Sequence, residues 1–318
     1  MHPASTDDPI DFRTAAPAAG SLEVAWIHGS PSRKASREPL IQVHHYDEHT
    51  VIMRQSKSVS YEAPFLYLLF GNDRALLLDT GATAGDGRFP LRATVDELID
   101  GWLSRHPREH YELIVAHSHG HGDHVAADGQ FAGRPATTVV SRELEAVQEF
   151  FGFTSWPDQI VALDLGGRVL EVAATPGHHR AAITIFDPWT GFLLTGDTVL
   201  PGRLYVEDHR QFLASLDKMT DLAAGRSVTF VLGCHVEMTR EPGRDFPLGA
   251  TYQPGERALQ LTTGQLGRIR DAVAEVAGRR GVHRFDDAIL YNEPRKRDVI
   301  GLMARGLAHK ALAAFPRR

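Results

Sequence analysis

Short apolar runs, separated by polar or glycine-bearing turns, fill most of residues 22–81. They are rich in β-branched and aromatic residues, a pattern that predicts strands. Residues 93–106 change to a helical period of about 3.6 residues with one apolar face, and predict the first helix. The strands expected before this helix lie at residues 22–29, 41–47, 50–56, 65–71 and 74–81.

The alternation of strand and helix patterns returns after the first helix. Two groups of strands, each closed by helices, predict an α/β fold in which two sheets pack together with helices outside, a four-layer αββα sandwich. The period is mainly helical from about residue 255 onward. The further strands are expected at residues 111–118, 137–141, 168–175, 181–187, 191–197 and 227–234, and the further helices at 142–153 and 208–222.

The chain is expected to form one domain behind a short tail. Residues 1–20 are rich in Ala, Pro, Ser and Asp without periodicity, which predicts a loose N-terminal tail. Residues 21–318 are expected to be a single domain, in which 250–318 is a mainly helical C-terminal extension. A chain of 318 residues is long enough to bury a sizeable core.

Composition narrows the classes of partner. The formal net charge of −6 argues against binding to a nucleic-acid backbone, which needs a basic excess. The longest apolar runs are far shorter than the ~20 residues that span a bilayer. The start of the chain lacks a secretory signal, and the one cysteine, Cys234, fits a reducing compartment. We therefore expect a cytoplasmic protein with a small-molecule substrate and neither a nucleic-acid nor a membrane partner, and the sequence leaves room for a homodimer.

The stretch "AHSHGHGDHVA" at residues 116–126 concentrates four histidines and an aspartate directly after an apolar run. His119 and His121 are two apart, a spacing that aims both rings the same way in an extended segment. Gly122 permits a tight turn before Asp123 and His124. Imidazole nitrogens and a carboxylate suit zinc, although a pH-sensitive patch would use the same residues.

Other histidines and an aspartate also stand at the ends of expected strands. His178 and His179 follow one strand, Asp197 ends a second, and His235 closes a third. Ligand sites of α/β proteins usually lie at the carboxyl ends of strands. Together with the histidine-rich stretch, these residues supply enough donors for two cations.

The order of these motifs resembles that of the metallo-β-lactamase fold superfamily. Residues 119–124, "HGHGDH", match its HxHxDH signature, and "LLLDTGA" (76–82) resembles its first motif. "TPGH" (175–178), "LLTGD" (193–197) and a later strand closed by histidine follow in the family's order. The resemblance covers roughly residues 40–240 and implies the αββα sandwich with a metal site at one edge.

The resemblance also implies a ligand set and a chemistry. Two zinc ions per chain are expected, and iron or manganese also suits these donors. The implied reaction is hydrolysis of a small ester, thioester, lactone or lactam by a metal-bridging hydroxide, with Asp123 also orienting the nucleophile and Asp79 orienting a ligand. Glyoxalase-II-like thioesterases and quorum-quenching lactonases are nearest in layout. The implied ligands are His119, His121 and His178 for one metal, Asp123, His124 and His235 for the other, and Asp197 between them.

Three other functions remain open on the sequence alone. A mononuclear iron persulfide dioxygenase uses the same scaffold with fewer of these residues as ligands. Phosphodiester hydrolysis uses the same metals, but the acidic net charge disfavours a nucleic-acid substrate. A non-catalytic metal-binding role is the third alternative.

Several residues near the motifs have competing interpretations. His117 is a strand-end or supporting residue rather than a ligand, and His179 competes with His178. Cys234 is expected to be a small buried residue. The stretch "HHYDEH" (44–49) is a rival metal candidate, although a hairpin bend explains it better.

Two further groups lie close to the motifs in sequence. Arg203 and Tyr205 follow Asp197 closely enough to reach the same cleft. An aromatic group is expected in the core rather than in a substrate pocket, and consists of Phe150, Phe151, Phe153 and Trp156.

Overall fold

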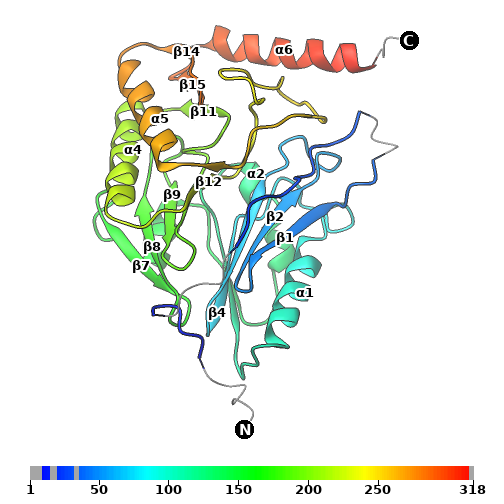
Figure 1. Cartoon of the computed structure of the whole chain (residues 1–318), viewed down its shortest axis with the longest axis vertical. Coiled ribbons are helices and arrows are strands. Elements are labelled where there is room, and N and C mark those ends of the chain that lie inside the picture. The colour runs from blue at the N-terminus through cyan, green and yellow to red at the C-terminus, as the bar shows by residue number, and fades with distance from the viewer. Residues whose placement is uncertain (1–8, 15–19, 32–35, 315–318) are drawn as a thin grey trace.

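The computed structural model describes residues 9–14, 20–31 and 36–314. Two six-stranded sheets pack against each other, and helices cover their outer faces (Figure 1). The αββα sandwich expected from the sequence is therefore confirmed. Every helix in the described ranges is too short or too polar to cross a lipid bilayer.

The first sheet is antiparallel at one side and parallel at the other. Its strands, in spatial order, are β1 (Ile41–Asp47), β2 (Thr50–Gln55), β3 (Phe65–Phe70), β4 (Arg74–Leu78), β5 (Glu112–Ala116) and β6 (Thr137–Val139). Strands β1 to β4 pair antiparallel, whereas β4, β5 and β6 run parallel. All six lie within segments that the sequence predicts as strands.

The second sheet is mostly antiparallel. Its strands, in spatial order, are β13 (Gln260–Leu261), β12 (Phe230–Gly233), β10 (Phe192–Gly196), β9 (Ile183–Asp187), β8 (Val169–Ala174) and β7 (Ile160–Asp164). Only β10 and β12 run parallel to each other. The helices that follow or cover the two sheets are α1 (Leu91–Leu103), α2 (Gly122–Val125), the 3₁₀ helix η2 (Asp128–Phe131), α3 (Leu144–Phe151), α4 (His209–Ala224) and α5 (Thr263–Glu275).

Strand β3 is buried on both faces, and its side chains divide between two layers. Tyr67 and Leu69 belong to the core between the two sheets, and Leu66 and Leu68 pack in the cluster that includes α1. This division follows from the two-residue repeat of a strand. On the other side of the molecule, α4 and α5 pack over the second sheet.

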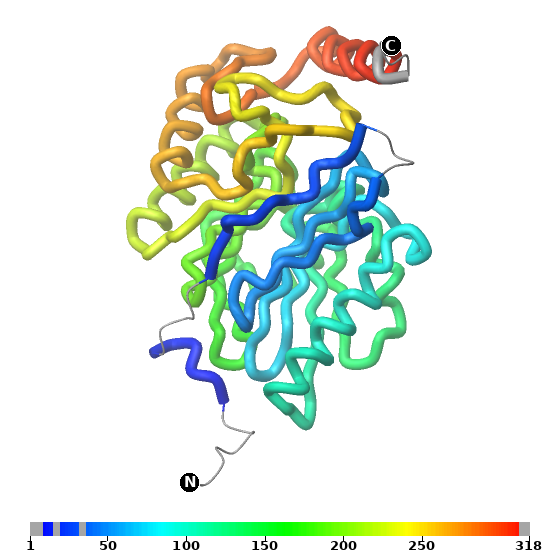
Figure 2. Tube along the Cα trace, turned by 45° about the vertical axis from the view of Figure 1, so that its right-hand side comes forward, coloured from blue at the N-terminus to red at the C-terminus, as the bar shows by residue number. Residues whose placement is uncertain are grey.

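A third, smaller sheet lies at one end of the sandwich (Figures 1 and 2). It contains β11 (Arg203–Val206), β15 (Ile289–Asn292) and β14 (Gly281–Arg284), and the chain continues into α6 (Lys296–Ala314). Leu302 of α6 packs on Ile289 and Tyr291, which ties the helix to this sheet. The C-terminal extension therefore holds the expected helices, and also strands β13 to β15 that the sequence analysis does not predict.

The prediction of a strand at residues 22–29 is wrong. Within this segment only Gly29 makes an isolated bridge, to Tyr252. The backbone is instead held by side chains: Gln42 bonds the backbone of Ala25 and Ile27, and Glu38 accepts from two further amides. Residues 22–29 therefore have the sequence pattern of a strand but form no continuous backbone pairing with a neighbouring strand.

Part of the expected loose tail is packed against the body. The Phe12 ring is 7% exposed and contacts the rings of His49 and Trp189 edge-on. Residues 1–8 and 15–19 of this expectation lie outside the described residues.

A buried arginine joins the two sheets. Arg168 precedes β8 and forms a bidentate pair with Asp187 on β9, with Nε–Oδ1 and Nη2–Oδ2 distances of 3.1 and 2.5 Å. Its Nη1 also donates to the backbone carbonyls of His49 and Phe70 in the first sheet, at 2.7 and 3.1 Å. Because both charged side chains are almost fully buried, these bonds are needed to offset the free energy lost when the two charges give up their hydration.

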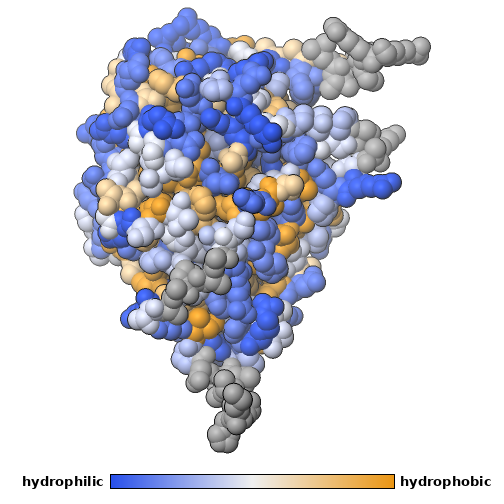
Figure 3. Space-filling model, viewed as in Figure 1, coloured by the Kyte–Doolittle hydropathy of each residue, from blue (hydrophilic) through white to orange (hydrophobic). Residues whose placement is uncertain are grey.

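The outer surface mixes polar and apolar side chains. On the face drawn in Figure 3, hydrophobic residues are interrupted by hydrophilic ones instead of forming one continuous area. Scattered apolar residues of this kind are normal on a globular surface.

Candidate metal centre

The sequence-predicted site residues meet at one edge of the sandwich. Strand β5 ends at Ala116 before the histidine-rich stretch, and β10 ends at Gly196 before Asp197. Strand β8 ends at Ala174 before the loop that carries His178, and β12 ends at Gly233 before His235. The carboxyl ends of strands from both sheets thus bring these side chains together, as the sequence analysis expects.

Three histidines form the first group. Nδ1 of His121 lies 2.9 Å from Nε2 of His119 and 3.1 Å from Nε2 of His178. The two Nε2 atoms are 3.3 Å apart. A tetrahedral zinc site with Zn–N bonds of about 2.0–2.1 Å places its ligand nitrogens roughly 3.3 Å apart. The three ring nitrogens therefore lie at, or a few tenths of an ångström below, the separation found around such an ion.

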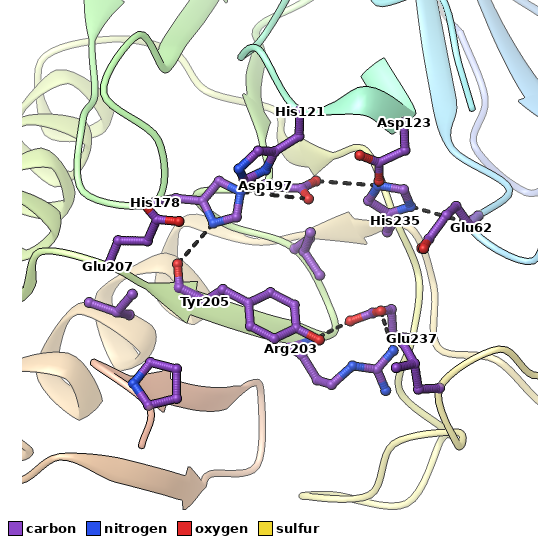
Figure 4. A pocket seen from close by; sticks show the side chains of 14 residues that line it. Glu62, His121, Asp123, His178, Asp197, Arg203, Tyr205, Glu207, His235 and Glu237 are labelled. Carbon is purple, nitrogen blue, oxygen red and sulfur yellow. Dashed lines mark hydrogen bonds and ion pairs between the residues drawn. The ribbon is translucent and has the colours of Figure 1, made fainter. Parts of the chain in front are cut away.

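The second group adds two carboxylates to two histidines. Nε2 of His235 lies 3.4 Å from Oδ2 of Asp123 and 3.6 Å from Oδ1 of Asp197. Nε2 of His124 lies 3.7 and 3.6 Å from the Oδ2 atoms of the same two carboxylates. Asp197 also approaches the first group, since its Oδ2 is 4.0 Å from Nε2 of His178. One carboxylate thus stands between the two groups (Figure 4).

Asp197 has an unsatisfied buried atom. Within the described residues, its Oδ1 is buried and has no hydrogen-bond partner. Leaving a buried carboxylate oxygen unpaired is costly, so an unpaired oxygen among facing imidazole nitrogens is the arrangement expected around a cation. The donor set therefore fits a divalent metal.

The charges of the site point the same way. Burial alone would raise the pKa of Asp197, but His235 and His124 hold it well below its usual value. Burial also opposes charge on His124, yet Asp79 and Asp197 outweigh this and raise its pKa well above the usual value. Burial and two neighbouring rings keep the pKa of His119 well below its usual value, which leaves a neutral ring. The carboxylates are therefore ionised among these rings, and a bound cation would balance their negative charge.

A fully buried carboxylate holds His124 in place. Oδ2 of Asp79 lies 3.0 Å from Nδ1 of His124, while Oδ1 accepts from the backbone N–H of Ser118 at 2.7 Å. The Ser118 hydroxyl and the Cys234 thiol also donate to Asp79, at 2.9 and 3.1 Å. Carboxylates that bind the outer nitrogen of a metal-binding histidine fix the ring and its tautomer. Asp79 is placed for this positioning role.

Backbone carbonyls orient two more rings. Nδ1 of His178 lies 2.8 Å from the carbonyl oxygen of Tyr205, and Nδ1 of His235 lies 3.1 Å from that of Glu62. Each contact leaves Nε2 facing the other donors of the site. Neither partner is recognisable in the sequence, because any residue type offers a carbonyl.

A glycine allows the two sheets to approach at the site. Gly196 has φ = +55°, and a Cβ there would lie 2.6 Å from Cβ of Ser118. Any larger residue would push the end of β10, and Asp197 with it, away from the segment that carries Ser118 and His119. This close approach explains the glycine before the aspartate.

A cavity of about 290 Å³ opens beside the two groups. Arg203 and Tyr205 reach it, as their place in the sequence suggests. Its other lining residues beyond the site histidines and aspartates are Glu62, Leu200, Val206, Glu207, Glu237, Leu248 and Pro294. Most of these lie on or next to β11 or in loops and carry no motif, so they are not predictable from the sequence.

The residues near the motifs lie in different surroundings. His178, not its neighbour His179, faces the other site nitrogens, while the His179 ring lies over Gly120. Cys234 is fully buried, as expected. His117 points to Asp128, with Nε2–Oδ2 at 3.2 Å, and lies outside both groups. Of the aromatic group, Phe151 and Phe153 are buried in the core, and Phe150 and Trp156 are partly buried and pack against it.

The rival stretch at residues 44–49 forms the hairpin between β1 and β2. Glu48 and His49 come close to His106, so the three side chains could face one ion. However, Nδ1 of His49 accepts a hydrogen bond from Nε1 of Trp102 at 3.1 Å, which places the ring proton on Nε2. The hairpin interpretation therefore explains this stretch.

Comparison with known proteins agrees with this geometry. A family model described as the metallo-beta-lactamase superfamily matches residues 62–235, more than half of the chain. The chain belongs to the metallo-beta-lactamase superfamily. The protein is accordingly a hydrolase of a family that is generally metal-dependent.

Members of the superfamily differ in how much of this chain they match. The hydroxyacylglutathione hydrolase of Rhizobium meliloti (strain 1021) is 24% identical over 237 residues, which cover 69% of this chain and 89% of that protein. The hydroxyacylglutathione hydrolase of Thermosynechococcus vestitus is 32% identical over 165 residues, with 49% and 60% covered. The solved metallo-beta-lactamase FIM-1 of Pseudomonas aeruginosa has a TM-score of 0.50 at 13% identity, covering 77% of this chain and 99% of its own, and supports the shared fold.

Proposed function

We propose that this protein is a dinuclear zinc hydrolase that cleaves a small ester, thioester, lactone or lactam. The observation that carries the proposal is the pair of adjoining donor groups that share Asp197, beside a cavity large enough for a small molecule. His119, His121 and His178 would hold one ion, and Asp123, His124 and His235 the other. The net charge of −6 and the single buried cysteine favour a small substrate and a reducing, cytoplasmic setting.

Hydrolysis forms a bond from water oxygen to the acyl carbon and breaks the bond to the leaving group, which takes up a proton. When bound, the two zinc ions supply Lewis acidity for the carbonyl and lower the pKa of a water molecule. Asp123 is placed to orient that water and to accept its proton. Its Oδ2 faces His235 and His124, and its Oδ1 has no hydrogen bond within the described part of the chain.

Part of the cavity wall is apolar. This part consists of Leu200, Val206, Leu248 and Pro294. A small apolar cavity strengthens the electrostatic interactions at its polar end. These side chains would hold the acyl group while the polar end of the cavity receives the carbonyl.

Metal analysis and a substrate panel on the purified full chain test the proposal. We expect two zinc ions per chain and turnover of at least one substrate among esters, thioesters, lactones and lactams, with an Asp123→Ala variant giving the background rate. One iron per chain with oxygen uptake would instead identify a persulfide dioxygenase. Turnover of phosphodiesters alone, or of nothing above the Asp123→Ala background, would also contradict the proposal.

The positioning of His124 by Asp79 can be tested separately. An Asp79→Asn variant keeps the shape of the side chain, and asparagine tolerates the positive φ of 69° at this position. Loss of the charge that holds His124 should weaken zinc binding by about 10- to 100-fold. The affinity is measured by competition with a chromophoric chelator, and Asp73→Asn, an exposed aspartate in the turn before β4, is the matched control. Equal zinc affinity in both variants would exclude the positioning role.

A further inference from the structure

The cavity wall has an excess of negative charge that the metal ligands do not explain. Among the described residues that line it, the charged side chains outside the two donor groups are three carboxylates and one guanidinium. The carboxylates belong to Glu62, Glu207 and Glu237, and the guanidinium to Arg203. Away from the metal end, an anionic substrate group would meet these carboxylates, so the balance of charge bears on specificity.

Arg203 does not offset this excess toward a ligand. Its side chain is 3% exposed, and its guanidinium pairs with Glu237 and with Asp245, the latter at 3.0 Å. It also donates to the carbonyl oxygen of Phe246 at 2.8 Å. The one cationic group of the wall is therefore buried in existing pairs and is not presented to an acidic substrate group.

Glu207 differs from the other two carboxylates. Glu237 is bound by Arg203, and Glu62 lies beside His235 at the metal end of the cavity. Within the described ranges, the exposed side chain of Glu207 has neither an ion pair nor a hydrogen bond, although its backbone N–H bonds Gly177. In Figure 4 it stands on the side of His178, across the cavity from Glu62. It is an exposed carboxylate without a charged partner among the described residues, on the side of the cavity that carries His178.

An aromatic ring accompanies this carboxylate. Tyr205 lies on β11 and Glu207 directly follows the strand, and both line the same cavity. The Tyr205 ring lines the cavity and is steadied by the ring of Tyr291, with centroids 5.1 Å apart. A carboxylate beside an aromatic face is the combination that binds ammonium groups.

We propose that the substrate carries a positively charged amine or quaternary ammonium group away from the scissile bond, and that Glu207 and the ring of Tyr205 recognise it. This inference rests on the proposed hydrolase function. A substrate with a net positive leaving group would differ from hydroxyacylglutathione, whose thiol part carries two carboxylates and one ammonium group and is therefore net negative. The metal end of the cavity receives the carbonyl, and the β11 end selects the charge.

Three thioesters that share a butyryl group test the selection. Butyrylthiocholine is cationic, the butyryl thioester of 3,3-dimethylbutanethiol is its neutral isostere, and the butyryl thioester of 3-mercaptopropionate is anionic. We expect kcat/KM for the cation to exceed that for the neutral isostere by about tenfold, with the anion lowest. Because Glu207 is exposed, the ratio should shrink as salt is raised from low to 0.5 M or so.

Glu207→Gln should reduce the cation-to-neutral ratio several-fold, whereas Glu149→Gln should not. Glu149 lies exposed on α3 and does not line the cavity, so its loss makes the same change in net charge. A cation-to-neutral ratio near one, or a ratio that Glu207→Gln leaves unchanged, would overturn the inference while turnover of the neutral thioester preserves the hydrolase.

Calorimetric titration of the zinc-loaded protein with choline and with 3,3-dimethylbutanol gives a readout that needs no turnover. Tighter binding of choline that is lost in Glu207→Gln supports the charge selection even if no thioester is cleaved. In that case the proposed thioesterase activity is excluded, but the charge selection is not. Equal binding of the two probes counts against the charge selection.

Discussion

An Asp197→Asn variant is expected to lose bound zinc and hydrolytic activity together. The Asp197 carboxylate approaches both donor groups, with contacts of 3.6 Å to His124 and His235 and 4.0 Å to His178. An amide keeps the size but removes the negative charge, and its NH2 group would face ring nitrogens. Since loss of a supporting residue already costs about 10- to 100-fold in metal affinity or activity, kcat/KM should fall by more than about 100-fold here.

The decisive measurement is metal content after dialysis, read with kcat/KM on whichever substrate the panel identifies. His119→Ala should behave in the same way, because it removes a donor from the first group. Asp221→Asn, an exposed aspartate on α4, is the matched control and should keep both metals. If Asp197→Asn retained two zinc ions and full activity, a shared carboxylate between two metals would be excluded.

The donor groups could be predicted from the sequence because each part of the signal is local. A histidine or aspartate directly after an apolar strand is visible in "VAHSHGHGDH" and "LLTGD", and the family resemblance supplies the pairing of distant motifs. The cavity wall could not be predicted in this way. Glu62, Glu207 and Leu248 come from a loop, a strand end and a second loop, and only the packing of the third sheet brings them to one place.

The strands of the third sheet are missed because their pairing also joins distant parts of the chain. Strands β14 and β15 have only four residues each, and β15 pairs with β11, more than 80 positions earlier in the chain. A pairing over that distance leaves no periodic signal. Conversely, residues 22–29 alternate like a strand, but Gln42 and Glu38 satisfy their backbone through side chains. The hydrophobic periodicity is a more reliable guide to burial than to the pairing of backbone groups.

The buried pair of Arg168 and Asp187 leads to the largest expected effect on stability. Asp187→Ala would leave the guanidinium of Arg168 without its carboxylate, at a position where both side chains are at most 1% exposed. Breaking a buried pair from one side costs about 3–5 kcal/mol of unfolding free energy. The lost bonds would also include that from the Thr190 hydroxyl to Asp187, at 2.6 Å. We expect a large fall in Tm and in the urea midpoint, while the folded fraction still binds zinc because the pair lies outside both donor groups.

The chain contains a matched control for this experiment. Arg226 and Glu171 form a bidentate pair with both distances at 2.8 Å, but their side chains are 41% and 25% exposed. Glu171→Ala should therefore cost only about 0–1 kcal/mol, because water replaces the lost partner. A double variant, Arg168→Met with Asp187→Leu, removes both charges and should be more stable than Asp187→Ala alone. Equal destabilisation by Glu171→Ala and Asp187→Ala would mean that the geometry of the pair matters and its burial does not. A double variant less stable than Asp187→Ala would assign the stability to the bonds from Arg168 to the first sheet.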